Sequence, residues 1–302
     1  MWAIYQNGNT TVSFNLTTGT KIRETSDDDF KPAFAENLDI KITNACDRGC
    51  PMCYEGSTVG GKHSDIMNQK WLKTLHPFQE VALGGGNVLD FPDLLPLLEK
   101  LKSMRVIANI TLNQIHFLDH FEFVKKLYKQ GLVHGIGVSL VEPTDDLIQK
   151  IRQIPTVIIH TIVGITPISH YNALQNKGVK ILVLGYKDLG RGQEYRKYKG
   201  EKVSLKQEEL KQELRYRLKQ WKQSFYTISF DNLALQQLAI KELISEEDWE
   251  RLYQGEEGSQ TFYIDAVSQT FSESSIAPLS LRFPIMNHVD QMFAAIQNRH
   301  NN

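Results

Sequence analysis

Short apolar runs alternate with amphipathic segments from residue 38 to residue 185. In the first run, residues 38–43, apolar and polar side chains alternate, which is the two-residue period of a strand with one buried face. Strands are predicted at residues 38–43, 80–83, 105–111, 135–140, 156–162 and 180–184, and helices around residues 67–75, 91–101, 117–128, 144–151 and 168–176. This order predicts parallel strands joined by helical crossovers. The pattern by itself fits an open doubly wound sheet as well as a barrel.

The segments on either side carry different patterns. Before this region, residues 11–14 and 21–23 are typical of two strands around a Thr18-Gly19 turn, which predicts a hairpin. After it, residues 204–207 form a capping-box pattern that predicts the start of a helix. A strand is also expected at residues 226–230, a short helix at 233–240 and a strand at 261–264. The expected organisation is an N-terminal β element over residues 1–36, an α/β unit over 37–192, and a C-terminal helical and α+β extension over 193–302.

Composition narrows the class of protein. With 302 residues, of which 41% are hydrophobic, the chain can bury a full core. Its formal charge of -1 argues against a general nucleic-acid binder or a membrane-surface protein. The longest apolar runs, such as residues 157–159, are too short to cross a bilayer. We therefore expect a protein with no membrane contact, located in the cytoplasm.

Charge is unevenly distributed in the last third of the chain. Residues 191–222 contain 11 Lys or Arg against 5 Asp or Glu, a balance of +6, whereas residues 223–302 contain 4 against 11, a balance of -7. The basic stretch is either a solvated helix face or a surface that attracts an acidic substrate or an acidic redox partner such as flavodoxin.

All three cysteines lie within eight residues, directly after the first predicted strand. Cys46, Cys50 and Cys53 have the spacing C-x3-C-x2-C and can supply three thiolates to one metal centre, leaving a coordination position open. On an iron-sulfur cluster, an open position lets a ligand bind iron directly. The alternatives are a zinc site completed by His63, although such sites usually pair two ligand hooks, and a disulfide, which would leave one cysteine unpaired.

Glycines and polar residues follow the next predicted strands. Residues 84–87 read Gly-Gly-Gly-Asn and stand at the strand end where parallel β/α barrels place their ligand sites. Glycines let the backbone approach a ligand, but the same residues also fit an ordinary turn. Thr111 and Asn113 close the third strand and Ser139 lies near the end of the fourth, where they can bind a ligand or cap the next helix.

The cysteine spacing and its position after a strand resemble the radical S-adenosylmethionine (SAM) enzymes. The resemblance covers residues 38–192 and implies a partial (β/α)6 barrel. In that family three cysteines hold a 4Fe-4S cluster, and the methionine moiety of SAM binds the fourth iron. An electron from the cluster then cleaves SAM to methionine and a 5'-deoxyadenosyl radical. The resemblance therefore implies a 4Fe-4S cluster, SAM, and an electron donor such as flavodoxin or ferredoxin.

The resemblance also implies roles for individual residues. Gly84, Gly85 and Gly86 resemble the family's Gly-Gly-Glu motif, which contacts the methionine amino group. Asn87 stands where a Glu is common, so a neutral carbonyl would replace a carboxylate as the acceptor. Contacts with the ribose or the methionine carboxylate are implied for Thr111, Asn113 and Ser139. Contacts with adenine are implied for Met52, Val183 and Leu184, although core packing explains the last two equally well.

Basic and imidazole side chains beside the last strands are further candidates. Arg191, flanked by two glycines, could place a guanidinium at the cavity mouth to pair with a carboxylate, and the glycines also fit a simple exit turn. Lys187 is a second basic candidate. His134 and His160 are expected to be core or rim histidines rather than ligands.

Residues 262–265 and 271–272 resemble part of the cysteine-rich extension with which peptide-modifying family members hold auxiliary clusters. No cysteine lies beyond Cys53, so this would be a cluster-free version that serves as a substrate lid, or an unrelated α+β cap. The expected function is hydrogen abstraction from a peptide by a radical SAM enzyme. The alternatives are a small metabolite or nucleotide as substrate, and a non-catalytic iron-sulfur or zinc regulatory protein. The sequence assigns no catalytic residue.

Overall fold

A computed structural model describes residues 2–221 and 223–300 of the chain. Residues 1, 222, 301 and 302 lie outside it. A mixed sheet forms the centre of the molecule, with strand order β10-β9-β8-β7-β6-β5-β4-β11-β12-β13. From β10 to β11 every neighbouring pair is parallel. The strands are β4 (Asn37–Thr43), β5 (Glu80–Gly85), β6 (Ile107–Asn113), β7 (Ile136–Ser139), β8 (Val157–Ile162), β9 (Lys180–Leu184), β10 (Thr227–Phe230), β11 (Thr261–Asp265), β12 (Thr270–Ser272) and β13 (Phe283–Pro284).

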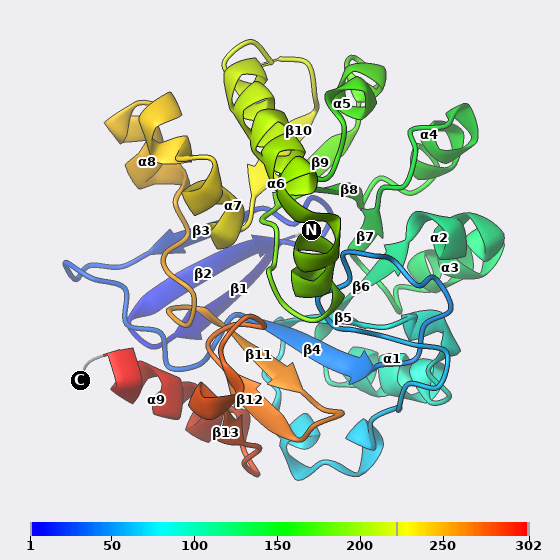
Figure 1. Ribbon diagram of the computed structural model, residues 1–302. Helices are drawn as coiled ribbons and strands as arrows, with labels where there is room; N and C mark the ends of the chain where they lie inside the picture. Colours follow the sequence, from blue (N-terminus) through cyan, green and yellow to red (C-terminus); the bar gives the residue numbers. More distant parts are fainter. Residues whose placement is uncertain (1, 222, 301–302) are drawn as a thin grey trace.

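Helices connect the parallel strands and cover the outside of the sheet (Figure 1). The α-helices are α1 (Leu94–Ser103), α2 (Gln114–Asp119), α3 (Phe121–Lys129), α4 (Asp145–Ile151), α5 (Ile168–Leu174), α6 (Arg191–Leu218), α7 (Asn232–Gln237), α8 (Glu246–Leu252) and α9 (Val289–His300). Short 3-10 helices are η1 (Ile66–Asn68), η2 (Lys70–Thr74), η3 (Val88–Asp90), η4 (Ile240–Leu243) and η5 (Leu279–Leu281). None of the helices within residues 2–221 and 223–300 is long and apolar enough to cross a membrane.

The two faces of the inner strands differ in burial. In β6 the side chains of Ala108, Ile110 and Leu112 are buried in the core, while Asn109, Thr111 and Asn113 between and after them are only partly buried and line a cavity. The same two-residue alternation recurs in β8 and β9. One face of the sheet therefore supplies the apolar core and the other supplies a ligand-accessible lining. The predicted α/β partial barrel is confirmed.

Two predicted helices differ in the structure. Residues 67–75 form the two short helices η1 and η2, because Gln69 between them has extended backbone. The capping-box prediction at Ser204 is wrong, since α6 begins at Arg191 and runs through this position to Leu218. A local pattern of Ser and Gln does not interrupt a helix that has already started thirteen residues earlier.

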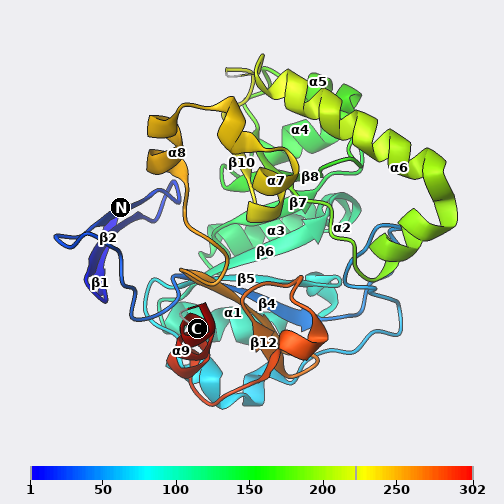
Figure 2. The same cartoon turned by 60° about the vertical axis from the view of Figure 1, so that its left-hand side comes forward.

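The N-terminal segment forms a separate three-stranded antiparallel sheet rather than a single hairpin: β1 (Trp2–Asn7), β2 (Thr10–Asn15) and β3 (Lys21–Glu24). Figure 2 shows it standing to one side of the central sheet. Ion pairs attach it to the amino ends of β4 and β5: Lys21 Nζ lies 2.7 Å from a Glu80 oxygen, and the Arg23 Nε lies 2.9 Å from Glu36. The β2–β3 turn thereby lies at the amino ends of the barrel strands.

The last third of the chain returns to the barrel. Strand β10 joins β9 and strand β11 joins β4, so both edges of the expected six-stranded sheet gain a parallel neighbour. In the β11–β4 pair, Ile264 lies opposite Ile40 and Asp265 opposite Lys41. The expected C-terminal extension therefore adds one parallel strand at each edge of the sheet, and β11 also lines the cavity.

Candidate cofactor site

A cavity of about 1240 Å³ occupies the inside of the barrel. At the carboxyl ends of the strands it is lined by the cysteine loop, residues 46–57, and by the glycine run, residues 84–86. At the amino ends it reaches Glu80, Lys180 and the Thr18-Gly19 turn of the N-terminal sheet. The cavity thus extends along the strands from one end of the barrel to the other.

The cysteine loop brings the three thiols to this cavity. Cys46, Cys50 and Cys53 are all free, half-buried and part of its lining. Burial raises the pKa of the Cys46 and Cys50 thiols, and the neighbouring cysteine charges raise that of Cys50 further. Three thiolates gathered there need a positive partner, so the donor set fits a metal centre of net positive charge.

Arg191 holds this loop in place from the start of α6. Its side chain donates from Nε to the Cys50 carbonyl (3.0 Å) and from Nη1 to the Ser57 carbonyl (2.7 Å). Its backbone N–H donates to the Cys53 carbonyl at 3.1 Å. The expected partner of Arg191 was a carboxylate at the cavity mouth; the structure instead gives the guanidinium backbone carbonyls, which the loop leaves without strand partners.

Replacing Arg191 with leucine is expected to loosen the cysteine loop. Two hydrogen bonds from a charged donor would be lost, which costs about 3 kcal/mol in the free energy of unfolding. Iron content after anaerobic reconstitution should fall by at least about half, because the three expected cysteine ligands lose their fixed spacing. Arg251→Gln, which breaks the exposed pair with Asp248, is the control and should change neither quantity. Wild-type iron content in Arg191→Leu would contradict this role.

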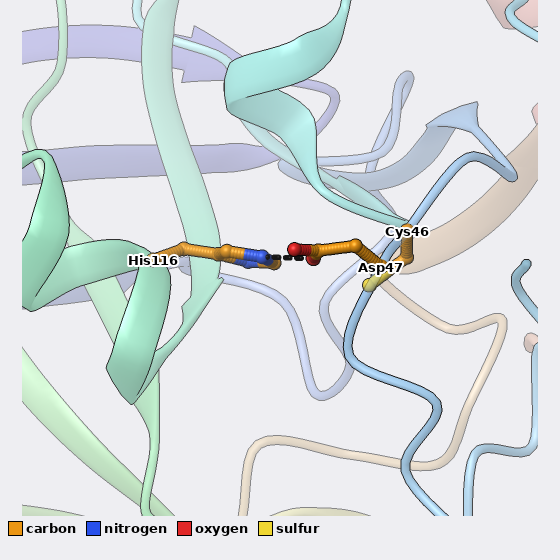
Figure 3. A group of neighbouring side chains, drawn as sticks. All are labelled: Cys46, Asp47 and His116. Carbon is orange, nitrogen blue, oxygen red and sulfur yellow. Dashed lines mark hydrogen bonds and ion pairs between the residues drawn. The ribbon is translucent and has the colours of Figure 1, made fainter. Parts of the chain in front are cut away.

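A second tie joins the cysteine loop to α2 (Figure 3). The buried His116 Nε2 lies 2.6 Å from Asp47 Oδ1, and one ligand atom each of Cys46, Asp47 and His116 lie within 4.8 Å of one another. Bonds from Arg48 and His116 hold the pKa of the Asp47 carboxyl well below its usual range. Sequence reasoning missed His116, because only the fold brings it to the loop.

The zinc alternative relied on His63, and the geometry gives it little support. His63 Nδ1 is bonded to the Thr43 hydroxyl at 2.9 Å, and in the part of the chain that the structure describes it joins no group of neighbouring metal-ligand atoms. A histidine does lie beside Cys46, but it is His116, whose Nε2 is already bonded to Asp47.

The glycine run packs tightly against the strand that precedes the cysteines. Gly85 has φ +110°, and a Cβ on it would lie 2.2 Å from the Thr43 carbonyl oxygen. A Cβ on Gly86 would lie 2.1 Å from the Ala45 carbonyl oxygen. By contrast, a Cβ on Gly84 would meet nothing within 4 Å. Gly85 and Gly86 therefore serve close backbone packing, while Gly84 leaves open space at the cavity.

Asn87 does not face the cavity. It is only 4% exposed, its side-chain oxygen accepts from the Leu89 N–H at 3.2 Å, and its own N–H donates to the Ala45 carbonyl at 2.7 Å. It caps η3 and ties the glycine run to the cysteine loop. The role expected for it, as acceptor for the methionine amino group, does not fit this position.

The remaining residues that were expected to contact SAM either line the cavity or face away from it. Those that line the cavity are Met52, Thr111, Asn113, Ser139 and Leu184. Val183 alternates with Leu184 on β9, is fully buried in the core on the other face, and does not line the cavity. Asn113 is also close to the cysteine loop, with its Nδ2 3.9 Å from Cys50 Sγ, while its Oδ1 caps α2 through the Ile115 N–H.

Charged groups inside the barrel were not all foreseen. The Lys187 Nζ lies 4.1 Å from the centre of the Tyr54 ring and 2.8 Å from the Ser275 hydroxyl. Burial opposes its charge, but Tyr54 and the carboxylates of Asp231 and Asp39 outweigh burial and raise the pKa of Lys187. Burial also raises the pKa of both carboxyl groups. Asp39 faces the cavity, where the barrel encloses it. Its place among the polar, alternating positions of β4 is the sequence signal that could have identified it.

His160 also lines the cavity, from β8. Burial lowers its pKa to about 4, so the ring is neutral at physiological pH. Its ring fills the space above Gly137, where a Cβ would lie 2.2 Å from the ring. His134 bonds the Leu16 carbonyl at the amino end of the barrel, as expected of a rim histidine, whereas among the described residues the buried His160 Nδ1 has no hydrogen-bond partner.

Comparison with known proteins places this site in context. Residues 40–162, which include the cysteine loop and the glycine run, match the family described as the radical SAM superfamily. The fold is similar to Streptococcus suis SuiB bound to S-adenosylmethionine (TM-score 0.57, 12% identity, covering 90% of this chain and 81% of that chain). It is also similar to SuiB bound to the precursor peptide SuiA (TM-score 0.55, 11% identity, covering 90% and 83%). No curated protein matches this chain.

Proposed function

We propose that this radical SAM enzyme, whose domain of that class spans residues 40–162, modifies a peptide substrate. Enzymes of the class use a 4Fe-4S cluster and S-adenosylmethionine. When bound, these cofactors supply a one-electron cleavage of SAM that leads to hydrogen-atom abstraction from a substrate. The observation that carries the proposal is that three free thiols and an open glycine position line one large cavity.

The residues proposed to hold the two cofactors come from consecutive strand ends. Cys46, Cys50 and Cys53 would ligate the cluster, because no other cysteine exists in the chain. SAM would lie along the glycine run, where Gly84 leaves room for close approach of a charged amino-acid end. Residues proposed to complete this pocket are Met52, Thr111, Asn113, Ser139 and Leu184.

The protein's own contribution is orientation and enclosure. Arg191 and the Asp47–His116 pair keep the cysteine loop against the barrel rim, and Asn113 connects Cys50 to the end of β6. Strands β4 to β9 and β11 line the reaction space, and the Thr18-Gly19 turn lines its far end. Such enclosure limits the access of water and oxygen to reactive groups.

A peptide is the proposed substrate because of the size and length of the cavity. Small-molecule sites usually enclose about 300–1,000 Å³, and this cavity of about 1240 Å³ reaches both ends of the strands. SuiB, which shares the fold, has been crystallised bound to its precursor peptide. A small metabolite or nucleotide is the second candidate, since it would also fit beside SAM.

An acidic electron carrier is the proposed redox partner. Helix α6 begins at Arg191, beside the cysteine loop, and its segment carries the excess of six positive charges. Flavodoxin or ferredoxin would be attracted to such a surface, and salt would weaken the association. A cytoplasmic location is proposed because an oxygen-sensitive cluster requires a reducing compartment.

The test is SAM cleavage by the full chain, reconstituted anaerobically with iron and sulfide and reduced with dithionite. We expect 5'-deoxyadenosine by mass spectrometry, and its yield should rise with the peptide fraction of a cell extract but not with the small-molecule fraction. Stimulation by the small-molecule fraction alone would contradict a peptide substrate. A formed cluster without cleavage under any addition would instead identify a sensor, and binding of zinc without a cluster would overturn the class of site.

A further inference from the structure

A network of buried charges crosses from the barrel wall to the cysteine loop. Lys41 on β4 is its centre: its Nζ lies 2.6 Å from Glu55 Oε2 and 3.5 Å from Asp265 Oδ2. The three side chains are only 7–10% exposed. At such burial an ion pair is screened far less by solvent than a surface pair.

Two further residues close the network on the C-terminal side. Arg282 Nη1 lies 3.7 Å from the same Asp265 oxygen, and its guanidinium lies 5.3 Å from the centre of the Tyr263 ring. The Tyr263 hydroxyl donates to Glu55 at 3.4 Å. Burial, followed by the charges of Glu55 and Asp265, raises the pKa of Tyr263, so the hydroxyl keeps its proton. Two cations and two anions therefore balance within one group.

The network connects the two halves of the proposed cofactor site. Glu55 stands two residues after Cys53, within the cysteine loop. The stem of Lys41 packs against the glycine run, since its Cγ lies 2.9 Å from where a Cβ on Gly85 would be. Lys41 therefore touches both the segment proposed to hold SAM and the segment proposed to hold the cluster.

The anchor of the network belongs to the C-terminal extension. Tyr263 and Asp265 lie on β11, which is paired in register with β4, and Arg282 directly precedes β13. A second set of contacts links the same extension to the cysteine loop. Ser275, after β12, accepts from Lys187, and the Lys187 ammonium lies over the ring of Tyr54 in that loop. The β11–β13 segment thus reaches the cysteine loop twice.

A contribution to the free energy of unfolding does not by itself explain why these charged side chains are buried here. Removing charges from water is costly, and well-packed apolar residues of the same volume are often as stable as a buried ion pair. What charged pairs add is a fixed direction and distance between the segments that carry them.

We propose that Lys41, Glu55, Tyr263, Asp265 and Arg282 form a brace through which the C-terminal extension positions the cysteine loop relative to the glycine run. The proposal rests on the function assigned above to these two segments. The five residues are positioning residues, and the extension acts here as part of the cofactor site rather than as a lid.

Asp265→Asn is the main test, because it removes one charge and little else. Its Oδ1 can still accept from the Val267 and Ser268 N–H groups at 3.0 and 2.9 Å, so the β11–β12 turn is kept. Glu55→Gln tests the other anion, and Tyr263→Phe removes only one hydroxyl. Asp146→Asn, which breaks the exposed pair with Lys150 on α4, is the matched control.

The first readout is hydrogen–deuterium exchange of residues 46–58 in the full chain without iron. We expect exchange to rise about tenfold in Asp265→Asn and Glu55→Gln, less in Tyr263→Phe, and not in Asp146→Asn. In the double variant Asp265→Asn with Glu55→Gln, the rise in exchange should be only slightly larger than in the more affected single variant, because both changes open the same network. Unchanged exchange at residues 46–58, or additive effects, would overturn the brace.

The second readout uses the reconstituted chain and separates the brace from the proposed function. With the brace weakened, the reduced cluster should still form but its electron paramagnetic resonance spectrum should respond less to added SAM. A full response to SAM in Asp265→Asn would count against the brace. If no iron-sulfur cluster formed in the wild-type chain, the proposed function would be wrong. The exchange measurement on the iron-free chain would still show whether the brace exists.

Discussion

Cys50→Ala is expected to abolish both cluster formation and SAM cleavage, with 5'-deoxyadenosine falling at least about 100-fold. Cys50 is the middle one of the three proposed ligands, and with only three cysteines in the chain no other thiol can replace it. Its backbone carbonyl would still accept from Arg191, so the fold of the loop should survive. Iron and sulfide per chain, the visible absorption of the cluster, and product by mass spectrometry measure the result.

Val59→Ala is the control for this loss. Val59 follows the cysteine loop and is 80% exposed, so its truncation should leave cluster content and cleavage at wild-type levels. Melting temperatures of both iron-free variants should lie close to that of the wild type, since neither side chain is part of the core. If Cys50→Ala cleaved SAM at the wild-type rate, the three-cysteine assignment would be wrong.

Gly85→Ala is expected to destabilise the chain by at least about 3 kcal/mol. Two effects add: the backbone at φ +110° disfavours any side chain, and the new methyl would lie 2.2 Å from the Thr43 carbonyl oxygen. The Thr43 carbonyl already accepts from the Gly86 N–H at 2.8 Å, so the strand end cannot shift without losing that bond. Urea unfolding of the iron-free chain measures the change, through the midpoint at constant m-value.

Two other glycines separate these effects. Gly131 also has positive φ but open space around it, so Gly131→Ala should show only the backbone cost of about 1 kcal/mol. Gly84→Ala meets nothing within 4 Å and should leave stability within about 0.5 kcal/mol. Because its methyl enters the space proposed for SAM, it should weaken SAM binding by about tenfold. Normal SAM affinity in Gly84→Ala would argue against a close approach of SAM to the glycine run.

The elements that the sequence predicted well are those with a strong local pattern. The six strands of the central region lie within about two residues of their predicted bounds, because each is a short apolar or alternating run between turn-forming residues. The cysteine loop was identifiable because Cys46, Cys50 and Cys53 stand so close together. In both cases the information lies within about ten residues of chain.

Orientation and partner choice were less predictable. Val183 and Leu184 are adjacent apolar residues, and only the strand register decides which faces the cavity. Asn87 could be recognised as polar but not as the cap of η3. A carboxylate was the partner considered for Arg191, whereas in the fold its guanidinium donates to the distant Cys50 and Ser57 carbonyls. The contacts of Arg191 join residues more than a hundred positions apart in the chain, which no local pattern indicates.

The pairing of β11 with β4 has a consequence for how the protein is made. Thr261 pairs with Asn37, so this neighbour of the strand that precedes the cysteine loop is synthesised about 220 residues after it. At about 5–20 residues per second, translation leaves that edge of the sheet unpaired for about 10 to 45 s. Pairing over such a sequence distance is also slow to form once the chain is complete. Asp265 therefore meets Lys41, beside the cysteine loop, only after nearly the whole chain has been synthesised.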